Sequence, residues 1–177
     1  MSKINGLRRG YTTGTCAQAA AKAAAIMLTT GKIIKSVEVE LPNKEKLCLP
    51  LIEQKIGENF ARCAVIKDAG DDPDVTDRIK IFCEVRISGN KGITIKGGPG
   101  VGVVTKPGLV IPVGESAINP VPRKMITREV LPYIPADKGL EVIVSVPEGE
   151  ELAKKTWNPR LGIIGCLLYT SPSPRDS

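Results

Sequence analysis

The chain has 177 residues, of which 42% are hydrophobic but only 3% aromatic, and a formal net charge of +6. This length supports a hydrophobic core, which Val, Ile, Leu and Ala must fill. The absence of histidine excludes His-based catalytic triads and His-ligated metals, and five scattered cysteines without a Cys-x-x-Cys pair argue against a zinc site or a disulfide framework.

The net charge and the distribution of apolar residues also limit the classes of partner and the cellular location that we expect for this chain. A basic chain favours an anionic partner, but two Phe, three Tyr and one Trp offer few platforms for stacking nucleic-acid bases. A small polycarboxylate is therefore the predicted partner, and no nucleic acid is expected. No window of about 18 apolar residues and no secretory signal occur, so we expect a cytoplasmic protein without a membrane span. No oligomeric state is predicted.

An alanine-rich run predicts a first helix over about residues 15–28. Thr12, Thr13 or Thr15 can supply its N-cap, and Gly31 stands where a left-handed C-terminal residue is favoured. Alternating apolar and polar residues then predict strands at 36–41, 46–52, 61–67, 78–87, 93–96 and 140–146. The first two of these strands are expected to form a hairpin.

Two further helices are predicted, at 122–131 and 147–155. The first has Pro122 in its opening turn, and the second has acids at its start and lysines at its end, as the helix dipole favours. Residues 161–165 are expected to begin a buried strand. Many strands with few helices predict a mixed α+β fold, and no internal repeat is visible.

The loop before the first helix combines hydroxyls and a glycine, in the order Tyr11, Thr12, Thr13, Gly14 and Thr15. It lacks the lysine of a Walker A motif. The helix that follows has free amides and no acid in its first turn, which favours an anion such as a carboxylate. Ordinary helix capping by Thr and Gly is the alternative.

A second glycine-rich segment follows the strand predicted at 93–96. It fails the dinucleotide fingerprint, because Val103 occupies the position of the third glycine. Its glycines can let a ligand approach the backbone, and lysines flank it; a tight connection between strands is the alternative. The candidate residues here are Lys96, Gly97, Gly98, Gly100 and Gly102.

A cluster of acids, Asp68, Asp71, Asp72 and Asp74, lacks the spacing of a calcium loop. We predict a turn in which the carboxylates accept hydrogen bonds from nearby amides, with a catalytic carboxylate as the alternative.

Two arginines stand beside rigid Asn-Pro turns. Arg123 follows Asn119-Pro120, and Arg160 follows Asn158-Pro159. Charged residues on a helix face are usually only solvated, but an arginine next to a rigid turn is well placed to clamp a carboxylate with two hydrogen bonds.

Taken together, five segments in the same order resemble the CbiD family, and the resemblance covers about residues 4–165. They are residues 7–17, 67–76, 97–109, 117–123 and 155–163. The family consists of the cobalt-precorrin-5B C(1)-methyltransferases of anaerobic cobalamin biosynthesis. The resemblance implies transfer of a methyl group from S-adenosylmethionine to a ring carbon of a corrinoid precursor, with cobalt present only as part of this substrate. It identifies no catalytic residue and no protein-bound metal.

The resemblance also implies two domains. The first is α+β and similar to a circularly permuted form of a domain of a small-subunit ribosomal protein; the second is α/β with a parallel sheet. Within the first, Lys96 and the hydroxyl, glycine, Asn and Arg residues named above become candidates for binding the acid-bearing substrate.

The sequence departs from the family after Gly165, where members continue with a glycine-rich stretch and this chain continues with Cys166 and a tail containing two Ser-Pro pairs. We therefore expect a first domain at 1–155, a truncated start of the second domain at 156–165 and a non-native tail at 166–177. The donor site is expected mainly in the second domain, so the chain is expected to be an inactive fragment. A basic RNA-binding module of the ribosomal type is the competing interpretation.

Overall fold

The computed structural model of the chain describes residues 12–68, 78–103, 111–112 and 114–149, and the backbone alone of residues 3–4, 7–8, 104 and 163–164. The helices are α1 (Thr13–Thr30) and α2 (Pro120–Val130), which the short 3-10 helix η1 (Leu131–Tyr133) follows. The strands are β1 (Lys3–Ile4), β2 (Leu7–Arg8), β3 (Ser36–Glu40), β4 (Lys46–Pro50), β5 (Ile52–Ile56), β6 (Phe60–Ile66), β7 (Lys80–Ser88), β8 (Gly92–Gly97), β9 (Val103–Val104), β10 (Gly139–Ser145) and β11 (Ile163–Ile164).

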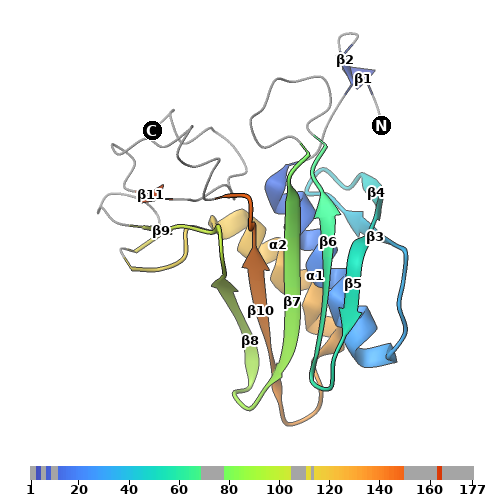
Figure 1. Cartoon of the computed structure of the whole chain (residues 1–177), viewed down its shortest axis with the longest axis vertical. Helices are drawn as coiled ribbons and strands as arrows, with labels where there is room; N and C mark the ends of the chain where they lie inside the picture. The colour runs from blue at the N-terminus through green and yellow to red at the C-terminus, as the bar shows by residue number, and fades with distance from the viewer. Residues whose placement is uncertain are drawn as a thin grey trace.

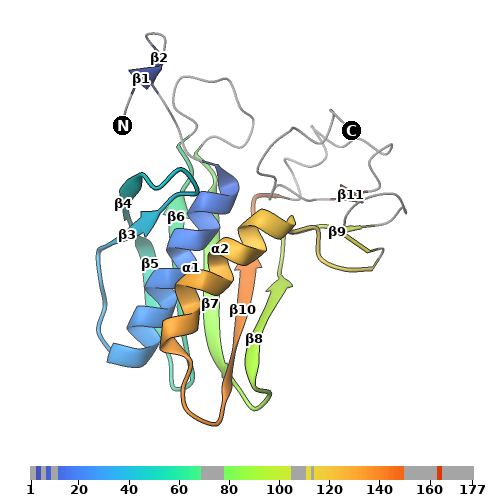
Figure 2. The ribbon, with the colours of Figure 1, turned by 180° about the vertical axis from the view of Figure 1, so that it is seen from behind.

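The main sheet has five strands in the order β5-β6-β7-β10-β8. Neighbours are antiparallel except β10 and β8, which run parallel. Both helices cover one face of this sheet, as the view from behind shows (Figure 2). No helix in the described part of the chain covers the other face, which is called the open face below (Figure 1). The predicted mixed α+β fold is confirmed.

The helix α1 is almost entirely enclosed. Every residue from Thr13 to Ala25 is buried except Lys22, because the sheet, α2 and β3 surround the helix. A helix that is apolar all round is expected to lie inside a protein, and alanine side chains let the neighbouring backbones approach closely. The helix ends at Gly31, whose φ of 71° is left-handed and whose amide donates to the Met27 carbonyl at 2.8 Å.

The small strand pairs correct two expectations. The strand predicted at 46–52 is divided at Leu51: β4 pairs with β3, whereas β5 joins the main sheet beside β6. The division follows Pro50, which has no amide hydrogen with which to continue a ladder. The strand expected at 161–165 is shorter in the described residues, where β11 is Ile163–Ile164 and pairs with Val103–Val104. Residues 150–155 of the predicted helix 147–155 lie outside the described residues.

Candidate functional site

The N-terminus of α1 uses its hydroxyls for capping. The Thr12 Oγ1 accepts a hydrogen bond from the Thr15 amide at 3.0 Å and donates to the Thr15 hydroxyl at 3.0 Å. Thr13 and Thr15 are buried, as is Gly14 between them. These contacts satisfy one of the free amides that begin the helix and fix the first turn against the sheet.

The base of the acidic segment lies beside this first turn. Backbone hydrogen bonds between Lys67 and the pair Arg78 and Ile79 bring residues 67 and 78 together at one end of the sheet. Burial raises the pKa of the Cys16 thiol to about 12; the charge of Lys67 opposes this shift and that of Asp68 adds to it. Both charges therefore act on the start of α1, and the structure brings Asp68 close to the predicted anion-binding turn.

The glycine-rich turn is joined to the end of β10. The Gly98 amide donates to the Val144 carbonyl at 2.7 Å, and the Val146 amide donates to the Pro99 carbonyl at 2.8 Å. Gly100 has a φ of +82°, and a Cβ built there would lie 1.5 Å from the Val146 carbonyl oxygen. The fold itself thus requires glycine at position 100.

The loop before α2 packs on the same turn and is held by Arg123. The Arg123 Nε donates to the Ile118 carbonyl at 2.8 Å, and its Nη2 donates to the Ser116 carbonyl at 3.0 Å. The Ser116 hydroxyl in turn accepts from the Gly97 amide at 3.0 Å. Asn119 is the N-cap residue of α2, without a side-chain capping bond. Arg123 is therefore a positioning residue that connects α2 to the glycine-rich turn.

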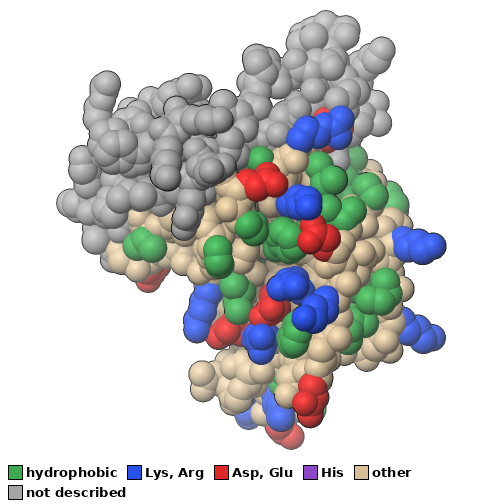
Figure 3. All heavy atoms as spheres, viewed as in Figure 1, with side chains coloured by type: hydrophobic (Ala, Val, Ile, Leu, Met, Phe, Trp, Pro, Cys, Tyr) green, Lys and Arg blue, Asp and Glu red, His purple; other side chains and the backbone are tan. Residues whose placement is uncertain are grey.

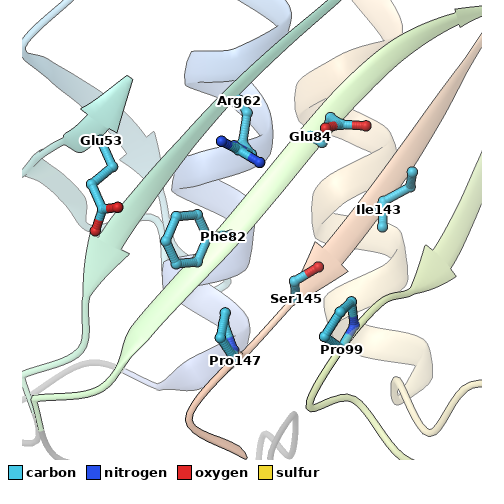
Figure 4. A pocket seen from close by; sticks show the side chains of 8 residues that line it. All are labelled: Glu53, Arg62, Phe82, Glu84, Pro99, Ile143, Ser145 and Pro147. Carbon is cyan, nitrogen blue, oxygen red and sulfur yellow. The ribbon is translucent and has the colours of Figure 1, made fainter. Parts of the chain in front are cut away.

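A pocket of about 410 Å³ lies on the open face next to this turn (Figure 4). Its walls come from β5, β6, β7 and β10 and from the segments that follow β8 and β10. The lining residues are Glu53, Arg62, Phe82, Glu84, Pro99, Ile143, Ser145 and Pro147. Pro99 belongs to the glycine-rich turn, so that predicted segment forms one edge of the pocket.

Both carboxylates of the pocket already have cationic partners. The Glu53 carboxylate lies 2.7 Å from the Lys80 ammonium, and its hydrogen bond and its charge both raise the pKa of Lys80. Glu84 forms an ion pair with Arg86. The remaining charged group in the lining is the guanidinium of Arg62, and Arg62 and Glu84 are opposite each other in the β6–β7 register. Figure 3 shows basic and acidic side chains interspersed with hydrophobic ones on this face.

The predicted site residues that the structure describes gather at one end of the main sheet. The start of α1, the glycine-rich turn and the start of α2 all lie at this end (Figures 1 and 2). Lys96 points to the open face instead, where its ammonium lies 3.0 Å from a Glu141 carboxylate oxygen. The predicted residues outside the described part are Tyr11, Asp71, Asp72, Asp74, Asn158 and Arg160.

The pocket residues that the strands contribute were not predicted from the sequence. A usable signal was present, since the alternation in residues 61–67 and 78–87 places Arg62 and Glu84 opposite the apolar positions of their strands. Among the described residues, no group of three or more potential ligands is suited to a metal ion. No helix in the same part of the chain has the length and apolar character needed to cross a membrane.

Comparisons with known proteins extend over nearly the whole chain. The model of the CbiD family matches residues 1–168. A cobalt-precorrin-5B C(1)-methyltransferase of Geotalea daltonii is 55% identical, with 91% of this chain and 47% of the relative covered. A protein of the same name from Moorella thermoacetica is 51% identical, with 93% of this chain and 44% of the relative covered. Another from a Thermoanaerobacter species is 50% identical, with 90% of this chain and 43% of the relative covered.

A solved structure agrees with these matches. The chain superposes on the crystal structure of the cobalamin biosynthesis protein CbiD from Archaeoglobus fulgidus with a TM-score of 0.68 and 32% sequence identity. The match covers 93% of this chain and 52% of that one, so the chain spans about half the length of the relatives it matches. The family model, the sequence relatives and the shared fold agree that this chain belongs to the CbiD family.

Proposed function

We propose that this chain is the substrate-holding part of a cobalt-precorrin-5B C(1)-methyltransferase. The reaction transfers a methyl group from S-adenosylmethionine to ring carbon 1 of cobalt-precorrin-5B and gives cobalt-precorrin-6A. The observation that supports this proposal is the identity of about half of the aligned residues, over about nine-tenths of the chain, to proteins that bear this name.

The chemistry of the chain suits this reaction. The corrinoid precursor carries acetate and propionate arms, and the chain has a net charge of +6 with which to hold them. Methyl transfer needs little acid–base catalysis, because the sulfonium of the donor is already a strong electrophile. Positioning of the ring carbon in line with the methyl group supplies most of the acceleration, so a chain without histidine can take part.

The pocket on the open face does not suit the methyl donor. Its uncompensated charge is the positive guanidinium of Arg62, which would repel a sulfonium cation. We therefore place the donor in the half of the relatives' length that this chain does not match, as the resemblance predicts. The role that we assign to the described residues is to hold and orient the macrocycle.

The finer description of the fold belongs to the same proposal. Two helices on one face of a mixed five-stranded sheet support kinship with a circularly permuted ribosomal-protein domain. An RNA-binding role is not favoured, because the relatives that share about half of the aligned residues are named as methyltransferases. The boundaries expected at residues 155 and 165 remain predictions.

A chimeric enzyme tests the proposed function. Residues 1–165 of this chain would be joined to the second half of the Geotalea daltonii relative and supplied with S-adenosylmethionine and cobalt-precorrin-5B. We expect a donor-dependent mass increase of one methyl group, detected by mass spectrometry. The complete relative is the positive control, and its second half alone is the negative control.

The methylation result is interpreted only for a chimera that is folded and binds the donor. Circular dichroism and a binding measurement with S-adenosylmethionine would establish that the chimera folds and holds the donor. If it does both and leaves cobalt-precorrin-5B unmethylated while the complete relative methylates it, the proposed function is wrong.

A further inference from the structure

The open face has more positive than negative charge around the pocket. The two pocket carboxylates are those of Glu53 and Glu84. Among the described residues, the central strands carry one further acid on this face, Glu141, which pairs with Lys96 at 3.0 Å. Lys55 lies opposite Arg62 in the β5–β6 register, and its ammonium lies 6.0 Å from the centre of the Phe60 ring. Arg62 thus has a cation on one side and an already paired carboxylate, Glu84, on the other.

The guanidinium of Arg62 also has an unsatisfied donor. Its Nε is buried from solvent and has no hydrogen-bond partner in the described part of the chain. A buried donor without a partner costs free energy, and in native proteins such a group is explained by strain, by a bound water or ion, or by a role in function. The side chain borders the pocket beside Phe82 and Glu84 (Figure 4).

A bulge in the edge strand shapes the same pocket. The register between β5 and β6 shifts between Ile52 and Lys55, and Glu53 within this bulge has a left-handed φ of 52°. Left-handed φ is unfavourable for a residue other than glycine, and bulges are common where a side chain is redirected next to a site. Here Glu53 lines the pocket and pairs with Lys80, so the Glu53 carboxylate is not paired with Arg62.

We propose that Arg62 is the anchor for one carboxylate arm of the macrocyclic substrate. The proposal rests on the proposed function for the identity of the macrocycle. A guanidinium holds a carboxylate with two parallel hydrogen bonds, and the Arg62 side chain lines the pocket that a carboxylate arm would enter. Phe82 and Ile143 provide apolar surface for the ring edge that carries the arm. The pocket volume of about 410 Å³ accommodates one such edge and leaves the rest of the macrocycle outside.

Binding of uroporphyrin, a fluorescent macrocycle with acetate and propionate arms, tests this assignment on the complete 177-residue chain. Dissociation constants would be measured by fluorescence anisotropy at constant ionic strength for the wild type, Arg62→Gln, Arg62→Lys and Lys96→Gln. We expect Arg62→Gln to weaken binding about tenfold or more, and Arg62→Lys to weaken it less. Lys96→Gln also removes a cation from the open face, and we expect a change of about twofold or less.

A measurement of stability distinguishes a role of Arg62 in binding from a role in maintaining the fold. Because the Arg62 Nε has no hydrogen-bond partner among the described residues, we expect Arg62→Gln to have a urea midpoint equal to or above that of the wild type while its affinity falls. The proposal is overturned if Arg62→Gln binds as tightly as the wild type, if Lys96→Gln costs as much affinity, or if the wild type does not bind the porphyrin. Failure of the proposed function has a different signature: the wild type binds through Arg62, but the folded, donor-binding chimera does not methylate.

Discussion

Three buried thiols mark where α1 meets the sheet. The Cys63 and Cys83 sulfurs lie 3.3 and 3.2 Å from the carbonyl oxygens of Ala20 and Ala17 in α1, as hydrogen-bond donors. Burial raises the pKa of the Cys63 and Cys16 thiols to about 12 and that of Cys83 well above its ordinary value. These cysteines therefore act as small core residues and not as nucleophiles or metal ligands.

The raised pKa values predict a loss of stability in alkali. Unfolded thiols ionise near the ordinary pKa of 9.0, whereas the folded Cys63 thiol stays protonated until pH about 12. Between these pH values the unfolded state binds fewer protons, so the free energy of unfolding falls as the pH rises, by up to about 1.4 kcal/mol per pH unit for each thiol. Urea unfolding from about pH 8 to about pH 11 measures this dependence, because this range starts below the unfolded pKa of 9.0 and ends below the folded pKa of about 12.

Replacement of one thiol provides the control. We expect Cys63→Ala to lower stability at neutral pH and its free energy of unfolding to fall less steeply with pH than that of the wild type. All the other ionisable side chains are common to both proteins. Equal slopes would show that the Cys63 thiol is not shielded as the structure indicates.

Arg123 was a candidate for binding a carboxylate because it is an arginine beside a rigid turn, but its contacts in the structure stabilise the fold. Its hydrogen bonds to the Ser116 and Ile118 carbonyls fix the loop between the glycine-rich turn and α2. We expect Arg123→Ala to lower the free energy of unfolding by about 1.5–3 kcal/mol, the range for hydrogen bonds that involve a charged group. Lys124→Ala removes a neighbouring exposed charge and is expected to cost about 0.5 kcal/mol or less. Chemical denaturation of both variants tests the comparison.

At the scale of elements, the glycine-rich turn and the end of α1 both contain glycine with positive φ. Gly100 has no room for a methyl group, because the added carbon would meet the Val146 carbonyl, whereas nothing lies within 4 Å of the corresponding position at Gly31. We expect Gly31→Ala to cost about 1 kcal/mol for its backbone conformation alone. Gly100→Ala is expected to cost at least about 2 kcal/mol more, because the turn must move away from β10.

The comparison of the two alanine variants identifies the cause. Thermal unfolding gives both costs under the same conditions. If Gly100→Ala and Gly31→Ala are equally destabilised, the contact between the turn and β10 does not exist as described.

The elements that local pattern determines were predicted well. The alanine run, the threonine cap and Gly31 located α1 to within two residues at each end, since all these signals are local. The separation of β4 from β5 was missed, because both segments alternate and the alternation does not show that the chain leaves one sheet for another at Leu51. Strand order and the parallel β8–β10 pair depend on contacts between distant residues, to which periodicity is blind.

For the whole molecule, one part of the candidate site could be predicted from the sequence and another part could not. Glycine and threonine motifs pointed to the end of the sheet where the start of α1, the glycine-rich turn and Arg123 gather. The sequence could not show that the Arg62 Nε is left without a partner among the described residues, because this depends on the pairing of Glu53 with Lys80 and of Glu84 with Arg86. Those pairings exist only after strands from distant parts of the chain have aligned.

In the proposed complex, the charged arms of the macrocycle bind it to the chain. The most direct test compares the dissociation constants of the intact chain for uroporphyrin and for a derivative whose arms are neutral primary amides, at constant ionic strength. We predict that the neutral derivative binds at least about tenfold more weakly, because it cannot form a charge-assisted pair with Arg62. Equal dissociation constants for the two macrocycles would contradict the claim.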